Sequence, residues 1–536
     1  MHIKRVYIDG FKRLTDFDLE LNPALNIIVG DNETGKTSVL EAISLVLSRQ
    51  HAGRYIDYAL DPYLFNAAKV AEYIAAVRDD KVIPPPRILI EAYLCDDSHS
   101  AELARLKGTN NTKSDNCPGL SLLIEVAPDY VEELKKYVKD SSNPEMVPVE
   151  YYMVSWRSFA GNGVTARNLP FKATMIDTTV ARVYRGPSKY VAQIVSDVLS
   201  EEKRRELSLA YKKLRHRFTE ESGVAAINTY LEDQGKLATR KKLTVQMDMS
   251  SRSGWDSAIT AHVDDLPFDC AGKGEQCRIH MRLAIAGAVK SPVLLIEEPE
   301  NHLSHSNMNT LMEGIAQQCV NQQVIVTTHS AFVLNKLGID NLKLISPSGK
   351  TATIAGLKPD TKDYFMRLPG YDTLRLVLSK RSILVEGPSD ELIVQRAYKD
   401  KHGKLPLEDG VDVISVGSLA FKRFLEIATL LDLDACVVTD NDKDVAALEA
   451  KYKDYLAGTD NKVRIFYDND ASCPTLEPQL LKVNSLEVLN RILGTTYAEE
   501  TALLAHMGKN KTDCALMMFK TSEKWAPPDY IAHAIK

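Results

Sequence analysis

The stretch VVTDNDKD places Asp440, Asp442 and Asp444 at every second position behind an apolar run. If the apolar run is a buried strand, Asp440 and Asp442 leave its end together, close enough to share a divalent cation. A calcium-binding EF-hand loop has acids at the same spacing, but it needs glycine at its sixth position and glutamate at its twelfth. Val445 and Lys451 occupy those positions, which excludes an EF-hand.

A second acidic stretch, ILVEGPSDE, lies about fifty residues earlier. Glu386 closes an apolar run in front of a glycine, a position suited to metal ligation, whereas Asp390 in a first helical turn has an ordinary explanation as a helix cap. If both apolar runs are parallel strands of one sheet, their carboxyl ends share an edge. Four carboxylates then converge on that edge: Glu386, Asp390, Asp440 and Asp442.

Four carboxylates this close repel one another unless cations occupy the site. Hard oxygen ligands select Mg²⁺ or Mn²⁺ over zinc. The alternative is a pair of solvated acidic loops, which the strand-ending position of Glu386 disfavours. The sequence therefore predicts a magnesium or manganese site in the last third of the chain.

A phosphate-binding motif lies near the N-terminus. GDNETGKTS, residues 30–38, fits G-x-x-x-x-G-K-[ST] between an apolar strand and a helical pattern. In such a loop backbone N–H groups surround the phosphates, and the helix N-terminus adds partial positive charge. We expect Lys36 to meet the β- and γ-phosphates of ATP and Thr37 to hold Mg²⁺. The predicted nucleotide-binding residues are Gly30, Asn32, Gly35, Lys36, Thr37 and Ser38.

Three further segments extend the nucleotide site. The apolar run VLLIEEPE ends in Glu297, which would order Mg²⁺ through water, and Glu298, which would orient or deprotonate the attacking water. TTHS places His329 at another strand end, where it would sense the γ-phosphate, although a lone histidine there is more often structural. The turn AGKGEQ before a helix would hold the far side of a nucleotide through Gly272, Gly274 and Glu275.

The bulk composition narrows the class of protein. The 536 residues predict roughly two to four domains, and 44% hydrophobic with 26% charged residues is ordinary for a soluble globular protein. No apolar run reaches the ~20 residues that span a bilayer, and MHIKRVYIDG lacks a signal-peptide core, so we expect a cytoplasmic protein without a membrane partner. The eight cysteines are scattered and read as reduced thiols.

The net charge of −6 does not suggest binding to nucleic acid by bulk electrostatics, nor does it exclude it. The basic patch EEKRRELSLAYKKLRHR (201–217) is more simply a solvated helix face. Strand-like runs occur at HIKRVYIDGF, TDFDLEL, NIIV, RILIEAYL and LSLLIEV, with a polar loop, KGTNNTKSDNCPG, before the last of them. A charged helical stretch follows from about 187 to 245, and β–α–β series appear around 291–330 and from 382 onward.

The P-loop, AGKGEQ, LLIEEPE and TTHS, in this order, resemble the Walker A, signature, Walker B with D-loop, and H-loop motifs of the ABC-type ATPase heads of SMC, RecF and Rad-type repair proteins. The resemblance covers roughly residues 1–350. In that family two heads sandwich ATP, which implies a homodimer. Glu297 stands where the family has aspartate, and the signature lacks its usual leucine-serine start; both differences weaken the case for fast hydrolysis more than for ATP binding.

The pair EGPSDE and TDND resembles the Toprim domain of topoisomerases, DnaG-type primases and certain nucleases. An ABC head followed by a Toprim resembles the OLD (overcoming lysogenization defect) family of nucleases, which includes the nuclease subunit of Gabija defence and the effectors of some retrons. PTLEPQL resembles the family's T-L-E segment and adds Glu477 to the implied metal ligands. KNKTDCALMM resembles its C-terminal end, where a lysine stands near the scissile phosphate; Lys511 matches best, and Lys509 remains an alternative.

The expected fold is α/β: an ABC/SMC-type P-loop ATPase head with an inserted helical dimerisation region, followed by a C-terminal Toprim (Rossmann-like) domain. The expected domains are the N-terminal part of the ATPase (1–186), the helical insert (187–250), the C-terminal part of the ATPase (251–375) and the Toprim nuclease domain (376–536).

The expected function is a metal-dependent DNA endonuclease gated by ATP, with two cations held by Glu386, Asp390, Asp440, Asp442 and Glu477. The resemblance further implies DNA as substrate, a homodimer or higher oligomer through the heads and the insert, and a role in antiphage defence. A partner such as a helicase, or a retron reverse transcriptase with its DNA, is consistent with it. The alternatives are a topoisomerase-like strand-passage enzyme and a RecF-type DNA-structure sensor or clamp without cleavage; a primase fits least, because no zinc module precedes the Toprim.

Overall fold

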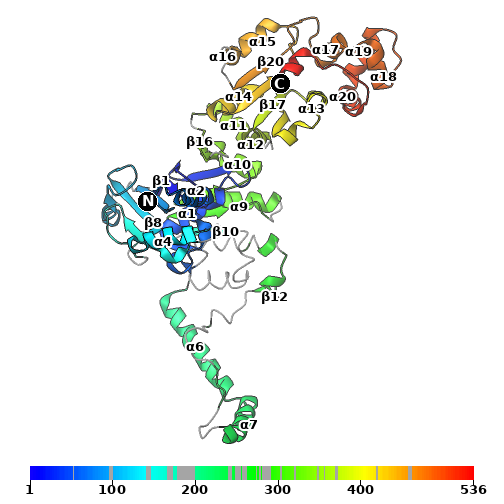
Figure 1. Ribbon diagram of the computed structural model, residues 1–536. Helices are drawn as coiled ribbons and strands as arrows, with labels where there is room; N and C mark the ends of the chain where they lie inside the picture. The colour runs from blue at the N-terminus through cyan, green and yellow to red at the C-terminus, as the bar shows by residue number, and fades with distance from the viewer. Residues whose placement is uncertain are drawn as a thin grey trace. The chain divides into compact units, whose positions relative to one another are not determined.

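The computed structural model describes residues 1–51, 54–95, 100–140, 146–165, 169, 173–177, 199–238, 244–247, 255, 262–272, 274–276, 279, 291–301, 305–318, 322–346, 349–354, 356–367, 372–417, 420–456 and 462–536 (Figure 1). The chain divides into two compact units. The first comprises Met1–Tyr7, Glu20–Leu25 and Val39–Thr327, and the second comprises Ile8–Leu19, Asn26–Ser38 and Thr328–Lys536. Among the helices of these described ranges, none is both long enough and apolar enough to cross a membrane.

In the first sheet, buried and half-buried residues alternate along β8. Its order is β2-β1-β6-β8-β7, and β9 pairs with β8. In β8, Leu120, Leu122 and Ile124 are fully buried and the residues between them are half-buried, as expected when one face of a sheet covers a core. Its strands are β1 (His2–Asp9), β2 (Phe17–Glu20), β6 (Ile88–Cys95), β7 (Lys107–Gly108), β8 (Cys117–Val126) and β9 (Tyr152–Ser158).

The polar stretch KGTNNTKSDNCPG, predicted as a loop, is partly strand. Its first two residues form β7, which pairs with Cys117 and Pro118 at the start of β8. The buried carboxylate of Glu91 accepts the backbone N–H of Thr112 at 3.0 and 3.1 Å and fixes the middle of the loop. The loop prediction is therefore wrong at both ends, where tertiary pairing overrides the turn-forming composition.

The second sheet contains the strand that precedes the P-loop. Its order is β10-β13-β14-β3-β15-β16. The pairs β10–β13, β13–β14 and β3–β15 are parallel, and every residue of β3, β13, β14 and β15 is buried, the pattern of a sheet covered on both faces. Its strands are β3 (Leu25–Gly30), β10 (Ala173–Asp177), β13 (Val293–Glu297), β14 (Gln323–Thr327), β15 (Leu342–Ile345) and β16 (Thr351–Thr353).

The third sheet belongs to the C-terminal part of the chain. Its order is β18-β17-β19-β20 and all its pairs are parallel, as the sequence predicted. Val385 at the end of β17 pairs with Ser415 on one side and Val438 on the other, so the residues after these strands leave the sheet at one level. The strands are β17 (Arg381–Val385), β18 (Val411–Ser415), β19 (Asp434–Val438) and β20 (Val463–Phe466).

One apolar core joins this third sheet to the helix that follows β17 and to the helices near the C-terminus. Ile383, Cys436, Leu489 and Met518, from strands and helices far apart in sequence, are all fully buried. Figure 1 shows α17 to α20 gathered in orange and red, with α20 beside α13. The helices are α13 (Pro388–His402), α14 (Phe421–Leu430), α15 (Val445–Lys451), α16 (Lys453–Leu456), α17 (Leu476–Val483), α18 (Leu486–Leu493), α19 (Glu500–Lys509), α20 (Lys511–Lys520) and α21 (Asp529–Ala534).

The remaining regular elements precede the third sheet, except η10, which lies between β17 and β18. The helices are α1 (Lys36–Ser48), α2 (Ala67–Arg78), α3 (Ala101–Ala104), α4 (Val131–Asp140), α9 (His305–Gln318), α10 (Ala331–Leu337), α11 (Pro359–Arg367) and α12 (Asp372–Leu378). Two short pairs of strands are β4 (Gln50–His51) with β5 (Arg54–Tyr55) and β11 (His262–Val263) with β12 (Leu266–Pro267). Single 3-10 turns are η1 (Ile56–Tyr58), η2 (Pro62–Leu64), η3 (Pro128–Tyr130), η4 (Val149–Tyr151), η7 (Phe268–Cys270), η9 (Ile339–Asn341) and η10 (Pro406–Asp409).

The predicted helical insert contains α6 (Glu201–Thr219) and α7 (Ser222–Ala238), so its helical character is confirmed there. Residues 187–198, 239–243 and 248–250 of the prediction lie outside the described residues. Leu207, Leu214 and Phe218 of α6 are exposed by 41%, 64% and 52%. With half-buried Tyr211 they are spaced four, three and four residues apart, which places them on one face of the helix.

Candidate functional site

The P-loop has the geometry that its sequence predicts. Lys36 is buried, and its Nζ donates to the carbonyl oxygens of Gly30 at 2.9 Å and Asp31 at 2.8 Å. A Cβ on Gly30 would lie 2.5 Å from the Thr34 hydroxyl and 2.7 Å from the Ile345 carbonyl, so no larger residue fits.

The rest of the loop turns into α1. Gly35 has φ +97°, a conformation that other residues rarely adopt. Thr37 and Ser38 stand in the first helical turn, with Thr37 exposed, and the Asn32 N–H is held by the Asp31 carboxylate at 2.7 Å. The first turn of a helix directs its unpaired N–H groups outward, which suits a phosphate.

The two glutamates after β13 have different surroundings. Glu297 is the last residue of the strand and is buried. Glu298 has φ +41°, its N–H donates to the Thr327 carbonyl at 3.0 Å, and its carboxylate accepts the Asn301 amide at 2.9 Å. A left-handed glutamate is strained, and such strain persists where the surrounding bonds enforce it, often at functional sites.

His329 lies between β14 and α10 and is half-buried. Thr328 beside it donates its N–H to the Ile28 carbonyl of β3 at 3.2 Å, and Ser330 caps α10. His329 is therefore held close to the strand that ends at the P-loop.

The predicted signature turn starts a helix, as expected. The Gly272 carbonyl accepts the N–H groups of Glu275 and Gln276, both at 2.9 Å, and Gly274 lies in the same turn.

In the C-terminal part of the chain, the two predicted acidic stretches meet. Glu386 follows β17, and its Oε1 accepts the Thr439 hydroxyl at 2.6 Å and the Asp440 N–H at 3.3 Å. These bonds join the ends of two neighbouring parallel strands. Asp390, in the first turn of α13, accepts the Gly387 N–H at 3.1 Å, so it is a helix cap as well as a neighbour of Glu386.

The acidic group is electrostatically crowded. Burial, followed by the negative charges of Asp390, Glu386 and Glu477, raises the pKa of Asp440 to about 8, although Lys511 opposes the rise. Burial and the charge of Glu386 likewise raise the pKa of Asp390 to about 6. Carboxylates that raise one another's pKa values lie close together, so Asp440, Asp390, Glu386 and Glu477 belong to one group.

Glu477 and Lys511 complete the group. Glu477, in the first turn of α17, is buried; its Oε2 accepts the Thr475 hydroxyl at 2.8 Å and its Oε1 lies 3.2 Å from Lys511 Nζ. Burial lowers the pKa of Lys511, but the charges of Glu477, Asp440 and Asp390 outweigh it, so the net pKa is raised. Lys509, the last residue of α19, is exposed, and only Lys511 of the two lysines contacts the acidic group in the described residues.

The two outer aspartates differ from Asp440. Asp442 is exposed, has φ +48° and donates its N–H to the Pro474 carbonyl at 3.3 Å. Asp444 accepts the Ala447 N–H at 2.9 Å and caps α15, which accounts for it without a metal.

The donor set fits a hard divalent cation, because only carboxylate oxygens face one another and their mutual repulsion favours a positive ion. As the side chains stand, no three acidic, histidine or cysteine groups among the described residues close around one point. Glu386, Asp390 and Glu477 are instead engaged by Thr439, Gly387 and Lys511. A cation bound here would therefore compete with the Gly387 N–H for Asp390 and with Lys511 for Glu477.

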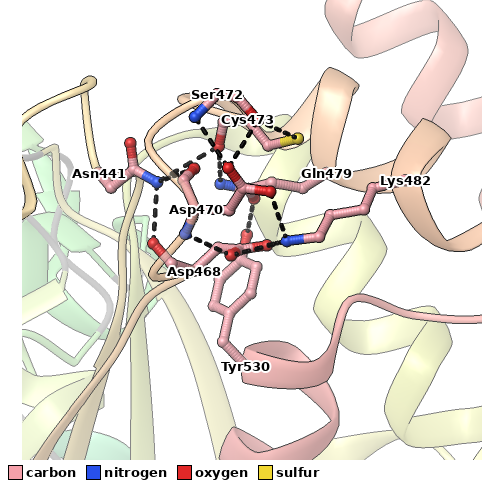
Figure 2. Close-up of polar contacts among 8 residues, drawn as sticks. All are labelled: Asn441, Asp468, Asp470, Ser472, Cys473, Gln479, Lys482 and Tyr530. Carbon is pink, nitrogen blue, oxygen red and sulfur yellow. Dashed lines mark hydrogen bonds and ion pairs between the residues drawn. The ribbon is translucent and has the colours of Figure 1, made fainter.

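A polar network beside the acidic group was not singled out from the sequence. Figure 2 shows Asn441 pointing into the loop between β20 and α17, where Lys482 bridges two acids, Asp468 and Asp470. The Asn441 side-chain amide donates to three carbonyl oxygens of that loop. The signal available in the sequence was a second D-N-D, at 468–470, one strand after the first and just before TLE.

Three parts of the chain match models of known domain families. Residues 377–442 match the Toprim domain of the overcoming lysogenization defect protein-like family. Residues 1–139 match an AAA ATPase domain, and residues 279–335 match an AAA domain described as a putative AbiEii toxin of a type IV TA system. The predicted order, a P-loop ATPase part followed by a Toprim domain, is confirmed.

The curated proteins that this chain resembles match it either over a short stretch or at low sequence identity. The DNA replication and repair protein RecF of Actinobacillus pleuropneumoniae serotype 5b (strain L20) is 38% identical over 72 residues, 12% of this chain and 20% of that protein. The RecF protein of Halothermothrix orenii is 21% identical over 373 residues, 64% of this chain and 96% of that protein. The match thus spans about a fifth of the length of the first of these relatives.

Among solved structures, the SMC head domain from Thermotoga maritima covers 66% of this chain and 99% of its own, with a TM-score of 0.31 and 12% identity. The SmcHead bound to the C-winged helix domain of ScpA has a TM-score of 0.35 and 15% identity, covering 66% of this chain and 98% of its own.

Proposed function

We propose that this chain, in which residues 1–139 match an AAA ATPase domain and residues 377–442 match the Toprim domain of the OLD-like family, is an ATP-binding, divalent-metal-dependent DNA endonuclease of the OLD type. The observation that carries the proposal is the bond between Glu386 and the Thr439–Asp440 strand end. It brings two acidic stretches, more than fifty residues apart in sequence, into one crowded carboxylate site. Such a site suits phosphodiester hydrolysis, where metal-bound oxygens must be held close together.

The residues that would hold Mg²⁺ or Mn²⁺ are Glu386, Asp390, Asp440, Asp442 and Glu477. Bound cations would lower the pKa of an attacking water and neutralise charge on the leaving oxygen. Thr439 and Thr475 orient Glu386 and Glu477 by hydrogen bonds, which keeps their second oxygens directed.

Lys511 would neutralise charge that builds on the scissile phosphate. Its Nζ contacts Glu477 at 3.2 Å while the side chain remains half exposed, so it can turn from the carboxylate toward a phosphate. Lys509 is the weaker candidate because it is exposed on α19 away from these contacts.

In the ATPase part, we assign ATP binding to the P-loop, with Lys36 on the phosphates and Thr37 with Glu297 on Mg²⁺. Glu298 and His329 are the candidates for orienting water and sensing the γ-phosphate. The signature turn at Gly272, Gly274 and Glu275 would contact a nucleotide held by another copy. Slow hydrolysis with ATP-dependent gating of the nuclease fits the glutamate at position 297.

Self-association is supported by the exposed apolar face of α6, formed by Leu207, Tyr211, Leu214 and Phe218. Four apolar side chains at heptad-like spacing are costly in water and are typical of helix pairing. We infer that a second copy covers this face in a homodimer or larger assembly.

An effector role in antiphage defence, with a helicase or a retron reverse transcriptase and its DNA as partner, is the biological setting that the OLD resemblance favours. Gabija and retron systems both contain such nucleases, and the chain's own residues do not distinguish between them. DNA is the substrate in either case.

The direct test uses supercoiled plasmid DNA with Mg²⁺ or Mn²⁺ and compares the wild-type chain with Asp440→Ala. We expect the variant to lose at least about 100-fold in cleavage rate, because one of the side chains that would hold the cations is removed. Asp444→Asn, which keeps a capping side chain at the next aspartate, is the matched control and should cleave normally. Equal cleavage by wild type and Asp440→Ala would exclude the proposed site, and a covalent protein–DNA adduct would favour the topoisomerase alternative.

A further inference from the structure

We propose that Asn441, the residue between the two aspartates of TDND, is a positioning residue that sets the spacing between Asp440 and Glu477. The inference rests on the proposed function, because it concerns the cation affinity of that site. Asn441 is only 1% exposed and contributes no carboxylate. Its amide instead ties the strand end that carries Asp440 to the loop that leads into Glu477.

The Asn441 side chain is fixed at both of its polar atoms. Its Nδ2 lies 2.8 Å from the Asp468 carbonyl, 3.0 Å from the Asp470 carbonyl and 3.3 Å from the Cys473 carbonyl. Its Oδ1 accepts the N–H of Lys443 at 3.0 Å. The first role needs a donor and the second an acceptor; the amide of asparagine supplies them on two separate atoms, whereas an ionised aspartate of the same shape supplies acceptors only.

The bond to Lys443 stabilises a strained turn. Asp442 and Lys443 have φ +48° and +71°, a left-handed conformation that costs energy in residues other than glycine. Asn441 Oδ1 closes this turn, and the Asp442 N–H adds a bond to the Pro474 carbonyl at 3.3 Å. The direction in which the chain leaves Asp440 therefore depends on Asn441.

The loop between β20 and α17, whose carbonyl oxygens accept the Asn441 amide, continues directly into α17, the helix that carries Glu477. Pro474 is followed by Thr475, whose hydroxyl binds the Glu477 carboxylate at 2.8 Å. A shift of this loop is therefore transmitted to Glu477 within three residues. Asn441 with three hydrogen bonds and Asp442 with one together form four bonds across the gap between the strand end and the loop.

Buried side chains of the domain core hold the opposite side of the loop in place. Gln479, which is fully buried, donates to the Cys473 carbonyl at 3.1 Å and accepts the Tyr530 hydroxyl at 2.6 Å (Figure 2). The Cys473 carbonyl thus accepts hydrogen bonds from the side-chain amides of both Asn441 and Gln479. Because the brace belongs to buried side chains, the loop has a fixed far side, and Asn441 sets how far the Asp440 strand end lies from it.

The outer rim of the loop provides a matched control. Ser472 is exposed and donates to Asp470 at 2.6 Å, without reaching Asn441 or Glu477. Ser472→Ala removes a hydrogen bond from the same loop but leaves the connection between Asp440 and Glu477 intact. Its effect therefore separates general loosening of the loop from loss of positioning.

The experiment measures binding of Mn²⁺ alone to the full-length chain by calorimetry at constant pH, without DNA or nucleotide. We expect the dissociation constant to rise at least about tenfold in Asn441→Ala and to stay within about twofold of wild type in Ser472→Ala. Cleavage by Asn441→Ala should recover at high Mn²⁺ concentration, whereas cleavage by Asp440→Ala should not. This recovery distinguishes a positioning residue from a ligand.

The outcomes separate the two proposals. If wild type and Asp440→Ala bind Mn²⁺ equally, the proposed metal site itself fails. If wild type binds and Asp440→Ala does not, but Asn441→Ala binds as wild type does, the positioning role is overturned. Should Asn441→Ala not fold, Gln479→Met tests the same loop from its braced side, and unchanged Mn²⁺ affinity there would equally overturn the inference.

Discussion

At the scale of single residues, the pKa of Asp440 shows how strongly burial and neighbouring carboxylates disfavour its negative charge. Burial and the charges of Asp390 and Glu386 raise its pKa from 3.8 to about 8. Between pH 3.8 and about pH 8 the folded chain binds more protons than the unfolded chain, so the free energy of unfolding falls as pH rises. The same repulsion that weakens the folded chain favours a bound cation, which would remove it.

Replacing Asp440 by asparagine should therefore stabilise the metal-free protein. In EDTA, the midpoint of thermal unfolding of Asp440→Asn is expected to match wild type near pH 4, to exceed it increasingly up to about pH 8, and to exceed it by a constant amount above that. Differential scanning fluorimetry across pH measures this. Asp444→Asn is the control, and a pH-dependent gain of equal size there would contradict the explanation.

At the scale of elements, α20 carries Lys511 at its first residue, so the position of the helix decides where that lysine points. The far end of α20 is held by Arg396 of α13, whose Nη1 donates to the carbonyls of Met518, Phe519 and Thr521 at 3.1, 2.9 and 2.6 Å. Carbonyls at a helix C-terminus lack partners within the helix, and an arginine satisfies them while complementing the helix dipole.

Arg396→Ala is expected to destabilise the Toprim part by about 2 kcal/mol, because buried carbonyls lose a charged donor. It should also lower the rate of plasmid cleavage, since α20 and Lys511 loosen together. Urea unfolding followed by circular dichroism measures the first effect. Arg491→Ala removes an exposed arginine whose Nε lies 3.9 Å from Glu523, and it should cost less than about 1 kcal/mol; equal losses in both variants would show that Arg396 has no special role.

At the scale of the whole molecule, the chain joins a P-loop sheet and a Toprim sheet, and α6 carries an exposed apolar face. The described acidic group brings together residues of one chain, from the segments that follow β17 and β19 and from α13, α17 and α20. The apolar face of α6, by contrast, has a physical reason only if something covers it.

The double change Leu214→Glu with Phe218→Glu should shift the protein toward monomer, because like charges replace apolar contacts on the pairing face. Light scattering on a size-exclusion column measures the mass over a range of concentrations. Lys212→Glu alters charge on the other side of α6 and should leave the mass unchanged. An unaltered mass in the double variant would show that α6 does not pair copies of the chain.

The sequence by itself determined the parts of the site that lie in short, strongly patterned segments. Glycines that must turn a chain around phosphate, buried strands ending in acids and the parallel order of the Toprim strands all follow from local rules. Asp440 and Glu386 could therefore be paired in advance, because parallel strands of one sheet must end at one edge. Glu477 and Lys511 came from the family resemblance, and the geometry brings both into the same group.

Tertiary structure alone decided which of several similar residues reach the site. Asp440 and Asp442 look equivalent in the sequence, yet one is surrounded by carboxylates and the other lies exposed on a left-handed turn. Lys509 and Lys511 are separated only by the start of a new helix, and one of them meets Glu477. Asn441 gave no sequence signal because its partners are backbone carbonyls, which every residue has; only the fold determines which of them come within reach of its amide.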